Sequence, residues 1–134
     1  MPPHGPPTER LAAFIRGHLQ VVENEIETAA VFFHEWTHLS EESRRHVIER
    51  RDAYQAHLKE IIAAGVAAGV FRASDVGVAT LLTLSTLNWS YQWVDPAGRM
   101  PLNEIAEQYV TYVLGALGGN QLASPLAAAG VQHA

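Results

Sequence analysis

Apolar residues recur every three or four positions along most of the chain, which is the spacing of helices that bury one face. No segment shows the strict alternation of polar and apolar residues that marks a half-buried strand. Thr8, Ser40 and Ser74 can each cap the start of a helix, and Gly69 can end one. The pattern predicts an all-α fold of five helices, over about residues 9–23, 25–39, 40–65 (or 40–68), 74–94 and 101–118.

The two ends of the sequence lack this periodicity. Residues 1–7 and 120–134 are rich in proline, glycine or alanine, a composition typical of disordered tails. We therefore expect one helical domain over residues 8–119, flanked by two disordered tails.

The fourth predicted helix has no charged residue between Gly77 and Val94. A helix that is apolar all round has to be buried all round. Its length would allow a membrane span, but Asn88, Ser90 and Gln92 crowd its second half. The fifth helix is broadly apolar as well. We expect each of the two to pack one face on the core and another on a second copy, which forms a four-helix bundle in a homodimer.

Composition narrows the class of protein. The 134 residues are 48% hydrophobic and 17% charged, as in an ordinary globular domain. A net charge of −5 argues against a nucleic-acid surface, which carries a basic stripe. Because there is no cysteine, neither disulfides nor thiolate metal sites can form. The first residues do not form a signal peptide, so we expect a cytoplasmic domain without a membrane contact.

Residues 34–38 read HEWTH and match the H-E-x-x-H pattern of zinc peptidases, in which two histidines bind Zn²⁺ and the glutamate is the general base. Here His34 and His38 lean toward the polar face of the predicted helix. The extended Met-turn motif is missing, and short patterns of this kind arise by chance. We interpret HEWTH as a coincidence and expect no metal, no cofactor and no enzyme activity; a small zinc hydrolase is the alternative that metal analysis would exclude.

Five local patterns follow one another along the chain, namely RLAAFIRGHLQVV, FFHEWTHLS, RRDAYQAHLKEIIAAGVAAGVFR, NWSYQWVDPAGRMPLNEIAEQYV and VLGALGG. Together they resemble the C-terminal effector-binding domain of TetR-family transcriptional repressors. The G-x-x-x-G-V-F-R turn and the N-W-x-x-x-W-x-x-P-x-G segment are most similar to the subgroup that senses acyl-CoA thioesters in fatty-acid and sterol catabolism. The resemblance implies a homodimer that binds a small hydrophobic ligand, such as an acyl-CoA.

Members of that family carry a three-helix DNA-reading domain ahead of this region, whereas seven residues precede the first predicted helix here. The arginine-rich stretch SRRHVIERRDAY runs into a long helix without the short turn of a helix-turn-helix. We expect no DNA binding by this chain alone, which would make it a truncated regulator or a stand-alone sensory domain. An alternative is a helical interaction module that pairs with a full-length paralogue.

We predict ligand contacts at positions where a charged or polar side chain interrupts an apolar helix face. Arg51 is in line with apolar residues of the third helix, where a guanidinium needs an anionic partner, either a ligand or a glutamate of the neighbouring helix. On the fourth helix, small hydroxyls between aliphatic and tryptophan side chains leave room and donors for an apolar ligand with a polar end, unless the tryptophans fill the core or the dimer interface. The predicted ligand-binding residues are Phe33, Trp36, Arg51, Tyr54, Leu82, Thr86, Trp89 and Trp93.

Overall fold

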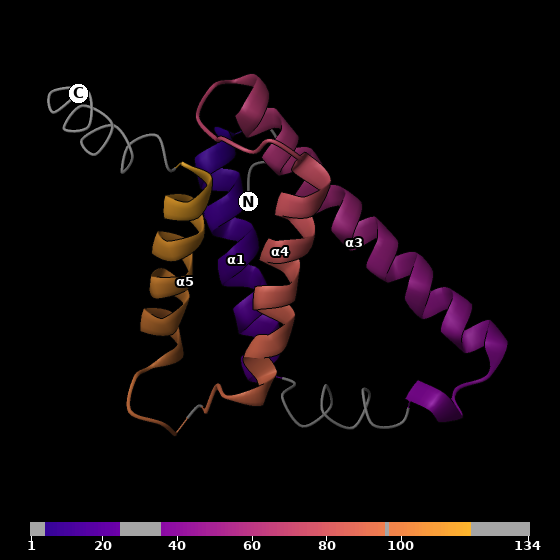
Figure 1. The fold of residues 1–134 in the computed structure, drawn as a ribbon. Helices are drawn as coiled ribbons and strands as arrows, with labels where there is room; N and C mark the ends of the chain where they lie inside the picture. Colours follow the sequence, from indigo (N-terminus) through magenta and orange to yellow (C-terminus); the bar gives the residue numbers. More distant parts are fainter. Residues whose placement is uncertain (1–4, 25–35, 96, 119–134) are drawn as a thin grey trace, which may run out of the picture.

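The structure, a computed structural model, describes residues 5–24, 36–95 and 97–118, and this part of the chain is all-α as expected (Figure 1). It contains two short 3₁₀ turns, η1 (Trp36–His38) and η2 (Ser90–Gln92). Most of the second predicted helix lies outside the described residues, and its last residues form η1. No helix within the described ranges is long and apolar enough to cross a bilayer. The α-helices are α1 (Pro7–Asn24), α3 (Glu41–Ala67), α4 (Val76–Trp89) and α5 (Leu102–Leu117).

Side-chain caps set where the helices begin. The Ser40 hydroxyl accepts a hydrogen bond from the Ser43 backbone N–H at 3.1 Å, so the predicted cap of α3 is confirmed. The cap of α4 is Asp75 and not Ser74, because the Asp75 carboxylate accepts from the Val78 N–H at 2.9 Å. A carboxylate interacts favourably with the positive end of the helix dipole. The Ser90 hydroxyl donates to the Leu87 carbonyl where α4 ends, well before the predicted limit.

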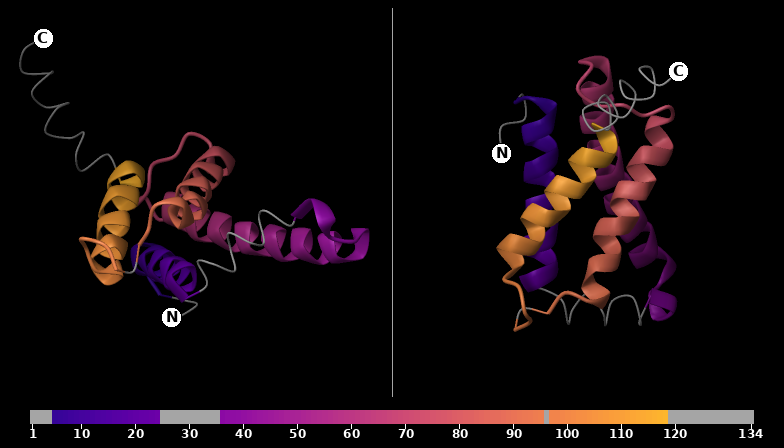
Figure 2. Two further views of the ribbon diagram at one scale, coloured as in Figure 1. Left: turned by 90° about the horizontal axis from the view of Figure 1, so that it is seen from below. Right: turned by 60° about the vertical axis from the view of Figure 1, so that its left-hand side comes forward.

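Helices α1, α4, α5 and the second half of α3 enclose one hydrophobic core. In Figure 1, α1 lies between α4 and α5, and α1 also packs on α3. Burial divides α3 into two parts, since no residue of α3 before Leu58 is buried. The first half of α3 therefore extends beyond the other helices (Figure 2). The largest fully buried apolar side chains are Leu11, Ile15, Leu19, Leu58, Ile61, Ile62 and Leu87.

The turn after α3 is built on two glycines. Gly69 has φ +77°, in the left-handed region that glycine adopts without steric cost. At Gly65 the absence of a side chain leaves room for the Phe71 ring, since a Cβ there would lie 1.9 Å from Phe71 Cδ2. The Phe71 N–H in turn donates to the Gly65 carbonyl at 3.0 Å. The turn places the buried Phe71 against the end of α3 and leads the chain to the start of α4.

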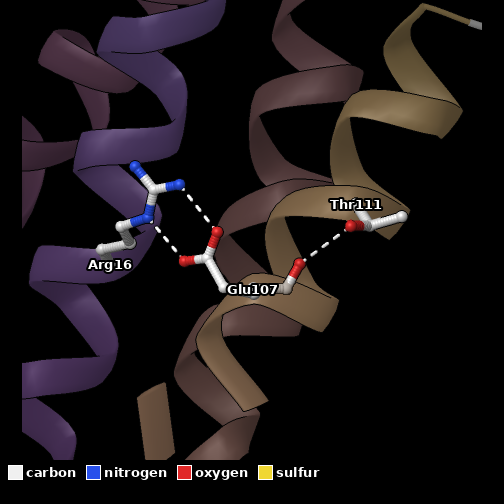
Figure 3. A network of polar contacts seen from close by, with 3 residues as sticks. All are labelled: Arg16, Glu107 and Thr111. Carbon is white, nitrogen blue, oxygen red and sulfur yellow. Dashed lines mark hydrogen bonds and ion pairs between the residues drawn. The ribbon is translucent and has the colours of Figure 1, made fainter. Parts of the chain in front are cut away.

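Two arginine–glutamate pairs tie α1 to its neighbours. Arg10 forms a two-point ion pair with Glu60 of α3. Arg16 donates to both carboxylate oxygens of Glu107 of α5 at 2.6 and 2.7 Å, and the Thr111 hydroxyl donates to the Glu107 backbone carbonyl (Figure 3). Hydrogen bonding to Arg16 lowers the pKa of the Glu107 carboxyl. Because this pair is exposed, it orients α1 on α5 more than it stabilises the fold.

Candidate functional site

Helix α4 buries two threonines beside Leu87 and exposes several large apolar side chains. Thr80 and Thr83 are buried against the core, whereas the apolar side chains on the opposite side are exposed. The two buried hydroxyls donate to carbonyls one turn earlier in the same helix, at 2.7 and 2.8 Å, so neither is left unsatisfied. Burying threonine while exposing leucine is unfavourable unless the exposed side has another partner. The exposed apolar side chains of α4 are Val78, Leu81, Leu82 and Trp89.

A groove of about 590 Å³ separates α4 from α5 on this outward side. Val78, Leu82 and Thr86 line its α4 wall, and Tyr112 and Ala116 are among the residues of its α5 wall. A second hollow of about 570 Å³ lies beyond the end of α4, where the Trp93 ring stacks on Tyr109 with centroids 6.0 Å apart. The groove, the hollow and the exposed residues of α4 together make up what we call the α4–α5 face.

A polar pair occupies the junction of α1, α3 and α4. His18 Nδ1 lies 2.8 Å from the Tyr54 hydroxyl oxygen, which joins α1 to α3. The Phe14 ring stacks on the Tyr54 ring with centroids 4.6 Å apart. The Leu87 backbone carbonyl of α4 forms a hydrogen bond with the His18 ring. One imidazole therefore contacts polar groups of two other helices.

A carbonyl can only accept, and Nδ1 faces the Tyr54 hydroxyl. The neutral tautomer that carries its hydrogen on Nε2 therefore suits both neighbours, because Nε2 can donate to the Leu87 carbonyl while Nδ1 accepts from Tyr54. In the neutral ring Nδ1 is then an acceptor, and the Tyr54 hydroxyl donates to it. Burial lowers the pKa of His18 more than the Leu87 carbonyl raises it, which favours the neutral ring. Burial also raises the pKa of Tyr54 to about 12, so Tyr54 keeps its hydrogen.

Of the predicted site residues on the α3 side, Tyr54 lies at this junction and Arg51 lies one turn earlier on α3. Arg51 was expected in line with core residues and is instead exposed, because residues of α3 are buried only from Leu58 onward. Trp36 is half-buried in η1, with the Arg44 guanidinium 5.9 Å from its ring centroid. Phe33 lies outside the described residues.

The predicted site residues of α4 lie in other surroundings. Leu82 and Thr86 line the α4–α5 groove, Trp93 lines the hollow beside Tyr109, and Trp89 is exposed. The Thr86 hydroxyl donates to the Leu82 carbonyl at 2.9 Å, so its hydrogen is used within the helix. The part of the chain that the structure describes does not bring these side chains together with Arg51 and Tyr54.

Sequence reasoning missed His18 as a functional candidate. The available signal was a histidine four residues after Phe14 on the apolar face of α1, but its partner Tyr54 is 36 positions away. The HEWTH segment falls partly outside the described residues, which include only its last three, and His38 is exposed in η1. Among the described residues no group of three metal-ligating side chains occurs.

The helices, the exposed apolar side chains of the α4–α5 face and the polar pair at the junction of α1, α3 and α4 define an all-α domain within the described residues. Residues 4–117 match the family described as tetracyclin repressor-like, C-terminal domain. The chain belongs to this family, whose members are regulators and not enzymes.

The relatives are DNA-binding regulators of greater length. Over 117 residues the chain is 26% identical to the HTH-type transcriptional repressor KstR2 of Mycolicibacterium smegmatis, a match that covers 86% of this chain and 57% of the relative. The structure of PfmR from Thermus thermophilus is 34% identical, with a TM-score of 0.75 over 81% of this chain and 59% of that one. AibR in complex with isovaleryl coenzyme A and operator DNA is 27% identical, with a TM-score of 0.67 over 85% and 60%. The chain thus spans less than two thirds of the length of each of these proteins.

Proposed function

We propose that this domain is the ligand-sensing and dimerisation part of a TetR-type transcriptional regulator and that it binds an acyl-CoA or a related hydrophobic carboxylic compound. Family membership supports the general class, since these domains serve regulators. The observation that carries the proposal furthest is the set of large exposed apolar side chains on α4, which lies opposite its buried residues Thr80, Thr83 and Leu87.

Dimerisation follows from the α4–α5 face. Its exposed large apolar side chains form a patch of the kind that marks an association surface. Because α4 and α5 both contribute, a twofold axis across this face would assemble the four-helix bundle expected from sequence. Across such an axis, each interface side chain lies near its own copy or near a neighbouring interface residue. A substitution in this face therefore changes the interface at two places in each dimer. These side chains are Val78, Leu81, Leu82, Trp89, Trp93 and Tyr112.

Ligand binding is proposed at the junction of α1, α3 and α4, on the side of the protruding half of α3. Arg51 is exposed and forms no ion pair with another described residue, and a guanidinium suits two-point binding of a ligand anion. Tyr54, one turn later, adds a hydroxyl and an aromatic ring. The likeness to AibR, whose structure holds isovaleryl coenzyme A, supports an acyl-CoA as the first ligand to test.

Two measurements on the purified chain test this function. Light scattering coupled to size exclusion should give twice the monomer mass of 14.7 kDa at micromolar concentration. Calorimetric titration with isovaleryl-CoA, with isovalerate and with coenzyme A alone should show saturable binding of at least one of them. A stable monomer would overturn the dimer, and the absence of binding across a series of acyl chain lengths would overturn the ligand class.

A further inference from the structure

The Tyr54 hydroxyl occupies the boundary between the core and the surface. Tyr54 lies one turn before Leu58, the first buried residue of α3, and it is 38% exposed. The stacked Phe14 ring holds its aromatic ring on α1, and His18 Nδ1 is 2.8 Å from its oxygen. Tyr54 is therefore partly exposed next to the half of α3 that carries the exposed Arg51, while its partner His18 is half-buried.

The hydrogen-bond arrangement of the neutral pair is unsuited to an anion. Tyr54 has one hydroxyl hydrogen, and in the neutral His18 tautomer with its hydrogen on Nε2 this hydroxyl hydrogen is given to Nδ1, 2.8 Å away. An anionic oxygen that approaches Tyr54 then meets only lone pairs. If the hydrogen turns to the anion, Nδ1 loses its donor and becomes an unsatisfied buried acceptor. A proton on Nδ1 resolves both problems, because His18 then donates to the Tyr54 oxygen and the Tyr54 hydrogen is free to point outward.

We infer that an anionic oxygen of the ligand binds to the Tyr54 hydroxyl together with one proton, which His18 takes up from solvent. His18 thereby changes from acceptor to donor at Nδ1, and Tyr54 keeps its own hydrogen and redirects it to the ligand. No covalent bond forms or breaks apart from the N–H bond made by that proton, and the net change is one ligand and one proton bound. The inference rests on the proposed ligand-binding function and makes His18 a positioning residue that favours anionic ligands through Tyr54.

Within the described residues, the charged and titratable groups around His18 come from α1, α3 and η2. On α3 the nearby groups are Tyr54 itself, exposed Arg51, and His57, whose ring lies 5.9 Å from that of Phe14. Helix α4 has no ionisable side chain, and η2 contributes only the Tyr91 phenol. On α1, Arg10 and Arg16 are each paired with a glutamate. His57 is therefore the second imidazole to control for.

The experiment measures proton uptake on ligand binding. Isovalerate, isovaleryl-CoA and coenzyme A are each titrated into the full chain near pH 7 in two buffers with different ionisation enthalpies, and the difference in observed heat gives the protons bound per ligand. The wild type should take up as much as one proton, and its affinity should rise by up to about tenfold for each unit decrease in pH while His18 is neutral in the free protein. Nuclear magnetic resonance of the His18 ring should show its titration moving to higher pH with ligand.

Variants identify the residues on which proton uptake depends. Tyr54→Phe keeps the stacked ring, and His18→Gln keeps a polar side chain, yet both should abolish proton uptake. His57→Gln is the matched control and should retain it. Uptake with isovalerate but not with coenzyme A identifies a carboxylate as the anion, and uptake with coenzyme A identifies a phosphate; either supports the inference.

Failure of the proton-coupled step can be distinguished from failure of the proposed function. Ligand binding without proton uptake, or uptake that persists in Tyr54→Phe and His18→Gln, overturns this inference and leaves the proposed function intact. If none of the three compounds binds to the wild type, the assignment of this ligand class fails and the proton-coupled step fails with it. Circular dichroism of each variant establishes that it folds; if His18→Gln does not fold, Tyr54→Phe together with the wild-type titration of His18 decides the question.

Discussion

Leu82 and Thr83 are adjacent residues of α4, yet the leucine is 65% exposed and the threonine is 7% exposed. The threonine is accommodated in the core because its hydroxyl donates to the Ala79 carbonyl at 2.8 Å and its methyl group packs as an apolar surface. The leucine lines the α4–α5 groove. This inversion is the physical basis of the proposed dimer, because a second copy would cover the leucine and leave the threonine where it is.

Replacing Leu82 with arginine should convert the dimer to a monomer. The change puts two charges near each other in a patch that has no acidic partner among the described lining residues other than Asp75. Sedimentation velocity or light scattering would report the mass. Ile48→Arg, at an exposed apolar position on the protruding half of α3, is the matched control and should remain dimeric. A Leu82→Arg dimer as stable as the wild type would contradict this interface.

Gly65→Ala should destabilise the fold. The added Cβ would lie 1.9 Å from Phe71 Cδ2, so the buried Phe71 ring has to move from its place against the core. Overpacking of this kind costs about 1–3 kcal/mol in the free energy of unfolding. The control is Gly17→Ala in the middle of α1, where a Cβ meets nothing within 4 Å and should stabilise by roughly 0.5–1 kcal/mol. Urea unfolding of both variants, at equal protein concentration, measures the change in the free energy of unfolding, which should decrease for Gly65→Ala and increase for Gly17→Ala.

Stability should fall as the pH is lowered through the unfolded-state pKa of histidine, about 6.5. Burial lowers the pKa of His18 in the folded state, so between the folded and unfolded values the unfolded chain binds more protons. The free energy of unfolding therefore rises with pH across this window and becomes level above it. Urea unfolding from pH 5 to 8 would show a smaller slope for His18→Gln than for the wild type. An equal slope in the two proteins would exclude His18 as the source, and His57→Gln tests the neighbouring imidazole.

Arg51→Ala should weaken the binding of isovaleryl-CoA, because a ligand anion would lose its guanidinium partner. Arg51 is exposed, so the expected loss is that of a solvent-screened pair, roughly 1 kcal/mol or about fivefold in affinity. Arg50→Ala, which removes an equal charge from the adjacent exposed position, is the control for a general electrostatic effect. Calorimetric titration at two salt concentrations measures the affinity of each variant. Equal affinities for the wild type and Arg51→Ala would remove Arg51 from the site.

The sequence by itself determined the secondary structure of most of the domain. Helical periodicity and capping are local properties, since a cap and the N–H that it accepts from lie within three residues, as in Ser40 and Ser43. The all-α class and the breadth of the apolar surface of the last two helices therefore follow from the order of residues alone. Where two local signals compete, as at Ser74 and Asp75, the predicted cap is off by one residue.

Tertiary structure decided which of these residues are buried and which meet. The apolar row of α3 continues through Arg51 and Tyr54, but its residues are buried only from Leu58 onward, because the first half of α3 extends beyond the described helices α1, α4 and α5. The exposed apolar face of α4 could not be inferred from sequence, because a helix with apolar residues on every side gives no sign of which face points to the core. His18 and Tyr54 come together only because α1 and α3 cross at that point, and a contact across 36 positions depends on packing that no local pattern encodes.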